Sequence, residues 1–309
     1  MTKPEERFLA GCAFVGGRYV PIDEAAIPIL DAGFVRSDLT YDVVGVCEGR
    51  FFRLEDHLDR LFRGCERLRL APPVTRDQVR ETVIECVRRA GLREAYVEMI
   101  VTRGIPPRGE RDPRRFDPRF YAFAVPYIWI ARPEQQLEGV DVVVARDTVR
   151  IPVGAVDPTV KNFHWADLTR ALFEAYDRGA ALPVLTDGDG NVNEGPGVNV
   201  AALIDGRLHT PARGVLQGIT RRTALEIATE MGLETIVDFL PVGALYRAQE
   251  IFVTSTAGGI IPVRSLDGRP VADGRPGPVT LAIRARYWSL HTDDRYTTVV
   301  EYPAPASVG

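Results

Sequence analysis

A change of hydrophobic period after Arg53 constrains the fold of this chain more than any other feature. Residues 41–52 form two strand-like runs separated by Glu48-Gly49, which is typical of a β-hairpin. From Leu54 to Leu70 the apolar residues recur instead at the roughly 3.6-residue spacing of an amphipathic helix. A helix with one apolar stripe has to bury that stripe against neighbouring elements, so we predict an α/β fold.

Further signals of both kinds flank this helix. Residues 13–20 alternate around a Gly-Gly pair and predict another hairpin. Thr75 and Gln78 make a capping box at the start of a second helix. Tyr96 to Thr102 alternates as a strand, which puts Tyr96 and Glu98 on one face. Helices and strands therefore alternate through the first part of the chain.

Two polar stretches define the predicted domain organisation. Arg103 to Arg119 is rich in proline and arginine, and it predicts either a solvated loop or a lid whose cations, Arg108 especially, help to hold an anionic substrate. Arg132 to Gln136 breaks the apolar pattern and predicts a linker. We therefore expect a small N-terminal domain at residues 1–130, a linker at 131–136 and a larger C-terminal domain at 137–309.

The composition argues against several classes of protein. The 309 residues carry a net charge of −4, which gives no reason to propose nucleic acid or a membrane as partner. No apolar run approaches the ~18–20 residues of a membrane span, and the first ten residues are not signal-like, so we expect a cytoplasmic protein. The four cysteines form no C-x-x-C pair and fit buried thiols of a reducing compartment. The four histidines show no ligand spacing, so we predict no metal site.

Lysine usage singles out one position. The chain has 38 basic residues, and only Lys3 and Lys161 among them are lysines. A primary amine can lose its proton and attack a carbonyl, whereas a guanidinium stays protonated. Lys161 lies between a predicted buried strand at residues 140–145 and a helical stripe that begins at Leu168. This position favours imine chemistry, although composition alone also allows a chance surface lysine.

Three later segments carry residue types suited to ligand binding. Glu194 is surrounded by glycines at a strand end, where a carboxylate can approach a flat ligand closely. Gly218, Ile219 and Thr220 open a helix and present backbone N–H groups suited to a phosphate. An apolar strand also runs into hydroxyls and glycines around Thr256. Each signal is weak alone, because solvated turns and ordinary helix starts have the same residue types.

Together and in this order, these features resemble the fold-type IV pyridoxal-phosphate aminotransferases, the family of branched-chain and D-amino-acid aminotransferases. Within it the match is closest to the (R)-selective amine transaminases. The resembling segments span nearly the whole chain and are Ser37–Val43, Gly49–Leu54, Val101–Gly104, Asp157–Trp165, Leu185–Asp189 and Thr256–Pro262. The resemblance implies a small N-terminal α/β domain, a larger C-terminal α/β domain with a barrel-like sheet, and the cofactor between them.

The resemblance also implies roles for the matching residues. Lys161 is the expected catalytic residue, which would hold pyridoxal 5′-phosphate as a Schiff base and shuttle a proton between the substrate carbon and C4′. Glu194 would pair with the pyridine nitrogen and keep it protonated, so that the ring accepts electrons. The expected phosphate ligands are Arg60, Ile219, Thr220 and Thr256.

The implied substrate pocket has one notable departure from the family pattern. Tyr41, Val43, Tyr96 and Trp165 match the family positions that shape the small and large parts of the substrate pocket. A part that admits only a methyl-sized group would make the site select one enantiomer. Arg36, however, stands where amine transaminases carry a histidine, and an arginine at the pocket mouth favours a carboxylate. This change would draw the substrate range toward D-amino or α-keto acids. Pro196 replaces a usual serine, and Phe163-His164 replaces a common Leu-Gln.

The expected activity is transamination from an (R)-amine to an α-keto acid such as pyruvate, which places the enzyme in class EC 2.6.1. Alternatives within the family are a D-amino-acid or a branched-chain-amino-acid aminotransferase. Aminodeoxychorismate lyase, which shares the fold and the lysine, is a remoter alternative, and a binding protein without catalysis is remoter still. The family also implies a homodimer in which pocket residues come from both subunits.

Overall fold

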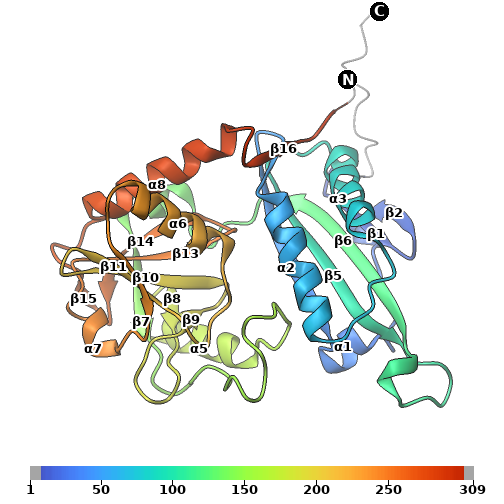
Figure 1. Ribbon diagram of the computed structural model, residues 1–309, viewed down its shortest axis with the longest axis horizontal. Helices are drawn as coiled ribbons and strands as arrows, with labels where there is room; N and C mark the ends of the chain where they lie inside the picture. Colours follow the sequence, from blue (N-terminus) through green and yellow to red (C-terminus); the bar gives the residue numbers. More distant parts are fainter. Residues whose placement is uncertain (1–7, 303–309) are drawn as a thin grey trace, which may run out of the picture. The chain divides into compact units, whose positions relative to one another are not determined.

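The chain divides into two compact units (Figure 1). The computed structural model describes residues 8–302. Unit 1 contains the described residues up to Ile128, the short segment Val160–Phe163 and the described residues from His291 onward. Unit 2 contains Trp129–Thr159 and His164–Leu290.

This division differs from the predicted domain boundaries at the C-terminal end and in the linker. Strand β16 (Thr297–Val299) pairs with β4 (Arg50–Phe52), so the end of the described chain belongs to unit 1. Pairing between segments this far apart depends on backbone hydrogen bonds that leave no local pattern in the sequence. Residues 131–136 contain the start of helix α4 (Pro133–Glu138), whose first position is a proline, as helix starts favour.

Unit 1 is built on a seven-stranded sheet in which all neighbours are antiparallel. The strand order is β16-β4-β3-β5-β6-β1-β2. The remaining strands are β1 (Cys12–Val15), β2 (Arg18–Pro21), β3 (Leu39–Cys47), β5 (Ala95–Ile105) and β6 (Asp117–Pro126). Both predicted hairpins are confirmed: Gly16 and Gly17 have φ of 59° and 76°, as a primed two-residue turn requires.

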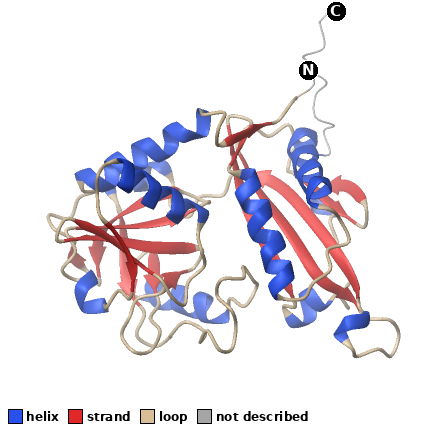
Figure 2. Ribbon diagram, viewed as in Figure 1, coloured by secondary structure: helices blue, strands red, loops and turns tan. Residues whose placement is uncertain are grey.

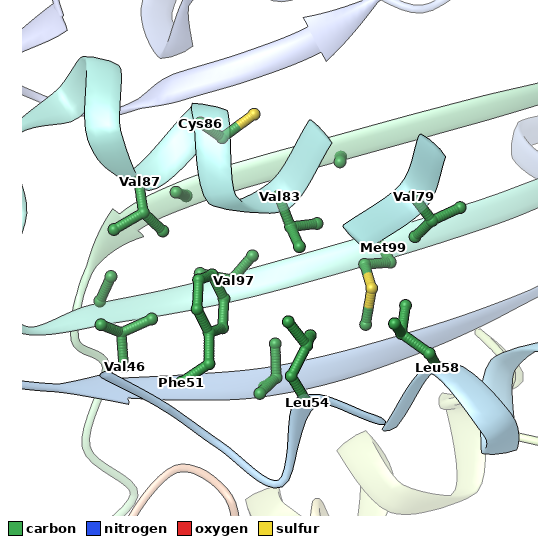
Figure 3. Close-up of a cluster of buried hydrophobic side chains, with 14 of the residues drawn as sticks. Val46, Phe51, Leu54, Leu58, Val79, Val83, Cys86, Val87, Val97 and Met99 are labelled. Atoms are coloured by element: carbon green, nitrogen blue, oxygen red, sulfur yellow. The ribbon is translucent and has the colours of Figure 1, made fainter. Parts of the chain in front are cut away.

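Helices α2 (Leu54–Arg67) and α3 (Arg76–Ala90) cover one face of this sheet. The predicted capping box of Thr75 and Gln78 is present at the start of α3. Figure 3 shows the core that results, in which Leu54 and Leu58 of α2 and Val83 of α3 point at Val97 and Met99 of β5. Because side chains alternate along a strand, the neighbouring residues of β3 and β5 lie on the opposite face.

Strands β5 and β6 extend further than the sequence predicts. Thr102 pairs with Arg119, and Ile105 pairs with Asp117 after an irregularity in the register. The segment predicted as a loop from Arg103 to Arg119 is therefore reduced to residues 106–116, with a short 3-10 turn at Pro113–Arg115. Helix α1 (Ala32–Arg36) precedes β3.

Unit 2 is built on a nine-stranded mixed sheet. The main path is β12-β11-β10-β13-β14-β7-β8, with β15 beside β14 and β9 beside β10. The bounds are β7 (Val140–Val144), β8 (Leu182–Val184), β9 (Glu194–Gly195), β10 (Val198–Ile204), β11 (Arg207–Pro211), β12 (Thr235–Asp238), β13 (Glu250–Ser255), β14 (Gly259–Leu266) and β15 (Arg269–Pro270). The pairs β11–β12, β14–β7 and β7–β8 are parallel.

Backbone hydrogen bonds connect the end of the strand order, at β8, with β9, which pairs with β10 in the middle of the order. The N–H of Leu185, just after β8, donates to the carbonyl of Glu194 at 3.0 Å, and the N–H of Asn193 donates to the carbonyl of Leu185 at 2.8 Å. Since Glu194 begins β9 and β9 pairs with β10, the sheet curls toward itself. The barrel-like sheet that the resemblance implies agrees with this connection.

The helices of unit 2 are α5 (Ala166–Asp177), α6 (Ile219–Glu230), α7 (Val242–Leu245) and α8 (Pro278–Ser289). Figure 2 shows α6 and α8 along the same side of the strands β13 and β14. The predicted helix start is confirmed, since α6 begins at Ile219 and Gly218 is its N-cap residue. Within residues 8–302, no helix has the length and apolar character needed to cross a membrane.

Candidate active site

Lys161 is attached to the edge of β3. Strand β4 pairs with β3 only at Val46 and Cys47, so the first half of β3 has an edge that β4 leaves open. The carbonyl of Lys161 occupies part of this edge, accepting from the N–H of Tyr41 at 3.1 Å and from the Thr40 hydroxyl at 2.9 Å. These two bonds hold the lysine backbone on a rigid strand, although its segment is irregular.

The Lys161 amine lies against an aromatic wall on the face of the sheet opposite α2. Its Nζ is 4.4 Å from the centre of the Tyr41 ring, within cation–π range. Tyr41 and Val43 are buried there, with Tyr96 packed against them. Phe163 also contacts Tyr41, at 4.5 Å between ring centres. The structure therefore brings together Lys161 and three of the predicted pocket residues.

A buried carboxyl, Glu98, belongs to the same wall. Its side chain is 8% exposed and accepts a hydrogen bond from the Tyr96 hydroxyl at 3.1 Å. Burial raises the pKa of Glu98 from 4.5 to about 7, and the positive charge of Lys161 opposes this rise. Near neutral pH, this carboxyl is close to its titration midpoint.

Arg60 lies on the helix-covered side of β3, where it is paired with Asp42. Its Nε donates to Asp42 Oδ2 at 2.7 Å and its Nη2 donates to Oδ1 at 2.8 Å. His57 Nδ1 lies 2.7 Å from the same Oδ1. Burial alone would raise the pKa of Asp42, but Arg60 and His57 outweigh it and hold that pKa well below the usual range. Arg60 is thereby fixed to Asp42, the residue that follows Tyr41 on β3 and points to the opposite face of the sheet.

Glu194 in unit 2 is held by groups from three segments. Its Oε1 accepts from Arg150 Nε at 3.1 Å. Its Oε2 accepts from the backbone N–H of Leu216 at 2.9 Å and is 3.5 Å from Asn199 Nδ2. Glu194 is 6% exposed, so these donors replace water around a buried carboxylate.

Arg150 links Glu194 to the base of the segment that carries Lys161. Its Nη1 donates to Asp167 Oδ2 at 2.7 Å, and the N–H of Ile151 donates to the same oxygen at 2.8 Å. Arg150 precedes the irregular segment and Asp167 is in the first turn of α5, which follows it. One buried arginine thus fastens both ends of this segment and one oxygen of Glu194.

The start of α6 lies beside the support of Glu194. Asn199 donates to the carbonyl of Leu216 at 3.0 Å, and a Cβ on Gly218 would approach Asn199 Oδ1 to 2.0 Å, so a larger residue there would displace the Asn199 side chain. Ile219 and Thr220 are the first two helical residues, whose N–H groups have no acceptor within their helix. Arg221 adds a buried positive charge. Its Nε donates to the Thr210 hydroxyl at 2.9 Å.

The remaining predicted residues lie at the ends of elements or in loops. Thr256 is in the turn between β13 and β14, and Trp165 is the N-cap residue of α5. Arg36 ends α1 and places its guanidinium 5.6 Å from the centre of the Phe116 ring. Arg108 is exposed in the loop at residues 106–116. The structure does not group Arg36 or Arg108 with Lys161 through any described contact.

Sequence reasoning did not identify Glu98, Asp42 or Arg150 as residues of the site. Strand alternation had placed Glu98 on the face of Tyr96, which was the available signal. Asp42 lies between two predicted pocket residues, but its pairing with Arg60 joins a strand to a helix and leaves no local pattern. Arg150 was one of many arginines, and only the tertiary structure distinguishes it.

Comparisons with known proteins agree with this architecture. A family model for class IV amino-transferases matches residues 39–266. A putative branched-chain-amino-acid aminotransferase of Methanocaldococcus jannaschii is 30% identical over 282 residues, which cover 90% of this chain and 96% of that relative. A D-alanine aminotransferase of Listeria monocytogenes is 28% identical over 269 residues, covering 86% and 91%. A crystal structure of the Escherichia coli branched-chain amino acid aminotransferase matches with a TM-score of 0.88 at 25% identity, over 94% of this chain and 100% of that one.

Fold and residue types thus define a transferase of the aminotransferase class, EC 2.6.1. The chain belongs to the class IV aminotransferases. Enzymes of this class are of the fold-type IV architecture and use pyridoxal 5′-phosphate.

The donor groups of the chain fit this cofactor. In unit 1, Lys161 would supply the amine that an aldehyde needs. In unit 2, Glu194 would supply a supported carboxylate for a pyridine nitrogen, and α6 begins with N–H groups and a glycine whose Cβ would meet Asn199. Among residues 8–302, no group of three or more His, Cys, Asp or Glu side chains is arranged to hold a metal ion.

Proposed function

We propose that this enzyme transfers an amino group from an (R)-amine to an α-keto acid such as pyruvate. One observation carries the proposal: the Lys161 amine lies 4.4 Å from the Tyr41 ring, on a wall that includes Val43 and Tyr96. Such a wall suits a small apolar group beside the reacting carbon. The segments that resemble (R)-selective amine transaminases, Ser37–Val43 among them, support the same choice.

Lys161 is the proposed catalytic residue. The cofactor, when bound, supplies an aldehyde that forms an imine with amines and a ring that accepts electrons. The Lys161 Nζ would act as the base that accepts the proton from the substrate carbon and gives it back. The bonds from Tyr41 and Thr40 fix the lysine backbone, so the amine moves only through its own side-chain rotations.

The other proposed residues bind and orient the cofactor. Glu194 would accept a hydrogen bond from the pyridine nitrogen, and Arg150 and the Leu216 N–H hold its carboxylate in place. Arg60, Ile219, Thr220 and Thr256 bind the phosphate. Arg60 suits this role because its pairing with Asp42 fixes the orientation of the guanidinium plane.

An amino-acid substrate is the second candidate. The relatives described above are a putative branched-chain-amino-acid aminotransferase and a D-alanine aminotransferase. Arg36 and Arg108 are the cations proposed to receive a carboxylate, and Trp165 is proposed to shape the large side of the pocket. Aminodeoxychorismate lyase activity remains the remoter alternative.

We also propose that the enzyme is a cytoplasmic homodimer. Four free cysteines, three of them buried, fit a reducing compartment. In and before α1, several large apolar side chains are exposed: Ile27, Ile29, Leu30, Phe34 and Val35. A second copy covering this segment would remove that apolar surface from water.

Incubation of the holoenzyme with (R)-1-phenylethylamine and pyruvate tests the proposal. The expected products are acetophenone and alanine, with the (S)-amine converted far more slowly. D-alanine and L-leucine with 2-oxoglutarate test the amino-acid alternative, and release of pyruvate from aminodeoxychorismate tests the lyase. Turnover of an amino acid without turnover of either amine would overturn the amine assignment.

The variant Arg36→Ala tests the carboxylate role of that side chain. If Arg36 receives the carboxylate of the keto acid, the KM for pyruvate rises while the KM for the amine stays the same. An unchanged KM for pyruvate would contradict this role.

A further inference from the structure

Glu98 is a buried carboxyl whose presence the proposed chemistry does not explain. It is 8% exposed and receives its hydrogen bond from the Tyr96 hydroxyl, a neutral group. Within residues 8–302, no Lys, Arg or His lies within ion-pair distance of its oxygens. A buried carboxyl with so little compensation is costly, which makes it a candidate for a functional role.

The position of Glu98 places its carboxyl in the wall beside Lys161. On β3 its partner is Val43, and on β6 its partner is Phe123. Tyr96 on its own strand packs with Tyr41 and Val43 in the same cluster. The carboxyl therefore sits among the side chains assigned to the substrate pocket.

Three ionisable groups act on Glu98 from the elements packed around it. Lys161 is the cation, and it lowers the pKa of Glu98; the Tyr96 hydroxyl lowers that pKa as well. Asp42 on β3 raises it, and Tyr41 is the remaining phenol of the wall. Its direct partner on β6, Phe123, has no charge. When Glu98 is ionised, the wall therefore carries a negative charge. The positive group beside it is the Lys161 amine, which the proposed function assigns to the cofactor.

We propose that Glu98 is a specificity-determining residue that keeps substrate carboxylates away from the Tyr41–Val43–Tyr96 wall. Two anions near each other in a poorly hydrated site repel strongly, and each pays a desolvation cost. A neutral amine meets no such cost, so the wall accepts its small apolar group. This inference rests on the proposed function, because it requires that the wall faces the substrate.

The same repulsion would orient substrates that do carry a carboxylate. A keto acid or amino acid would bind with its carboxylate on the side away from Glu98. Protonation of Glu98 removes the negative charge, and its pKa of about 7 puts that change in the neutral range. Affinity for a carboxylate should therefore increase as the pH falls from 8.5 to 6.

Binding of 4-methylvalerate to the holoenzyme tests the inference without turnover. This probe is a branched carboxylate that has no amino or keto group, and 4-methylvaleramide is its uncharged counterpart. We expect the wild type to bind the carboxylate about tenfold more weakly at pH 8.5 than at pH 6, with no such change for the amide. In Glu98→Gln the carboxylate should bind about as tightly at pH 8.5 as at pH 6.

Glu66→Gln serves as the matched control, since it removes one negative charge from an exposed position on α2 of the same unit. It should keep the wild-type pH dependence. A Glu98→Gln protein that also keeps it would overturn the inference. Should Glu98→Gln fail to fold, Glu98→Met removes the charge at similar volume, and it has the same expected and contradicting results.

The experiments distinguish failure of the Glu98 specificity role from failure of the proposed function. If Glu98→Gln relieves the pH dependence but the wild type converts no amine, the specificity role stands and the amine assignment fails. If the wild type converts the amine but Glu98→Gln leaves probe binding unchanged, the specificity role fails alone. A second measurement is the ratio of D-alanine turnover to (R)-1-phenylethylamine turnover. This ratio should rise about tenfold in Glu98→Gln at pH 8.5.

Discussion

Arg60 binds Asp42 through two parallel hydrogen bonds, from Nε at 2.7 Å and from Nη2 at 2.8 Å. Neither side chain is more than 8% exposed. The pair joins α2 to β3 behind Tyr41, whose N–H binds the Lys161 carbonyl. The proposed phosphate ligand and the proposed catalytic lysine thus depend on two consecutive residues of one strand.

Asp42→Asn should destabilise the protein by about 3–5 kcal/mol, because it removes the buried carboxylate charge that pairs with Arg60. Chemical denaturation at pH 7 measures the loss. The pKa of Asp42 is lowered by folding, so its contribution is full above the unfolded value and is lost as the pH falls. The difference between variant and wild type should therefore shrink in acid.

Asp59→Asn is the control for that variant. Asp59 also lies on α2 and pairs with Arg76, but its side chain is 51% exposed. Exposed pairs contribute about 0–1 kcal/mol, so the change should be small. Equal losses in the two variants would contradict the assigned importance of the buried pair.

Reduction of the holoenzyme with borohydride should attach the cofactor to one lysine only. With two lysines in the chain, peptide mass spectrometry can assign the site without ambiguity. We expect the label on Lys161 and none on Lys3. Lys161→Arg should remove both the label and the transaminase activity, because a guanidinium does not form the imine. Lys3→Arg should retain both, and labelling of Lys3 instead would refute the assignment.

Arg150→Met should destabilise the protein by about 3–5 kcal/mol, because Glu194 and Asp167 would both lose the cation that they share. The loosened segment at residues 151–165 should also become more sensitive to protease. Arg264→Met is the matched control in the same unit, since its pair with Asp141 is 40% and 33% exposed. It should change stability by about 0–1 kcal/mol. If the segment in Arg150→Met resists protease as well as it does in the wild type, Arg150 does not fasten it.

Local patterns account for the elements that were predicted well. The Gly16-Gly17 turn and the Thr75 capping box are decided by neighbouring residues, so the sequence contains all the necessary information. The pairing of β16 with β4 and the extension of β5 beyond Thr102 depend on hydrogen bonds between distant segments. Such pairings are set by tertiary packing, which overrides local propensity.

The same distinction applies to the candidate site. Lys161 stood out by its rarity among arginines, and Glu194 by its glycine neighbours. The edge of β3 that binds the Lys161 carbonyl could not be predicted, since it exists only because β4 is short. Glu98 was visible as a strand residue, but its lack of an ionic partner is a property of the folded chain.

The stability of the Glu98→Gln variant should exceed that of the wild type above pH 7. Folding raises the pKa of Glu98 from 4.5 to about 7, so the folded chain binds this proton more tightly than the unfolded chain. The contribution of Glu98 to wild-type stability is therefore complete below pH 4.5 and falls as the pH rises to about 7. The amide cannot ionise and avoids this loss. Denaturation at pH 5 and pH 8 should show the advantage of the variant growing by roughly 1–3 kcal/mol, and an advantage independent of pH would show that Glu98 is not the group that titrates.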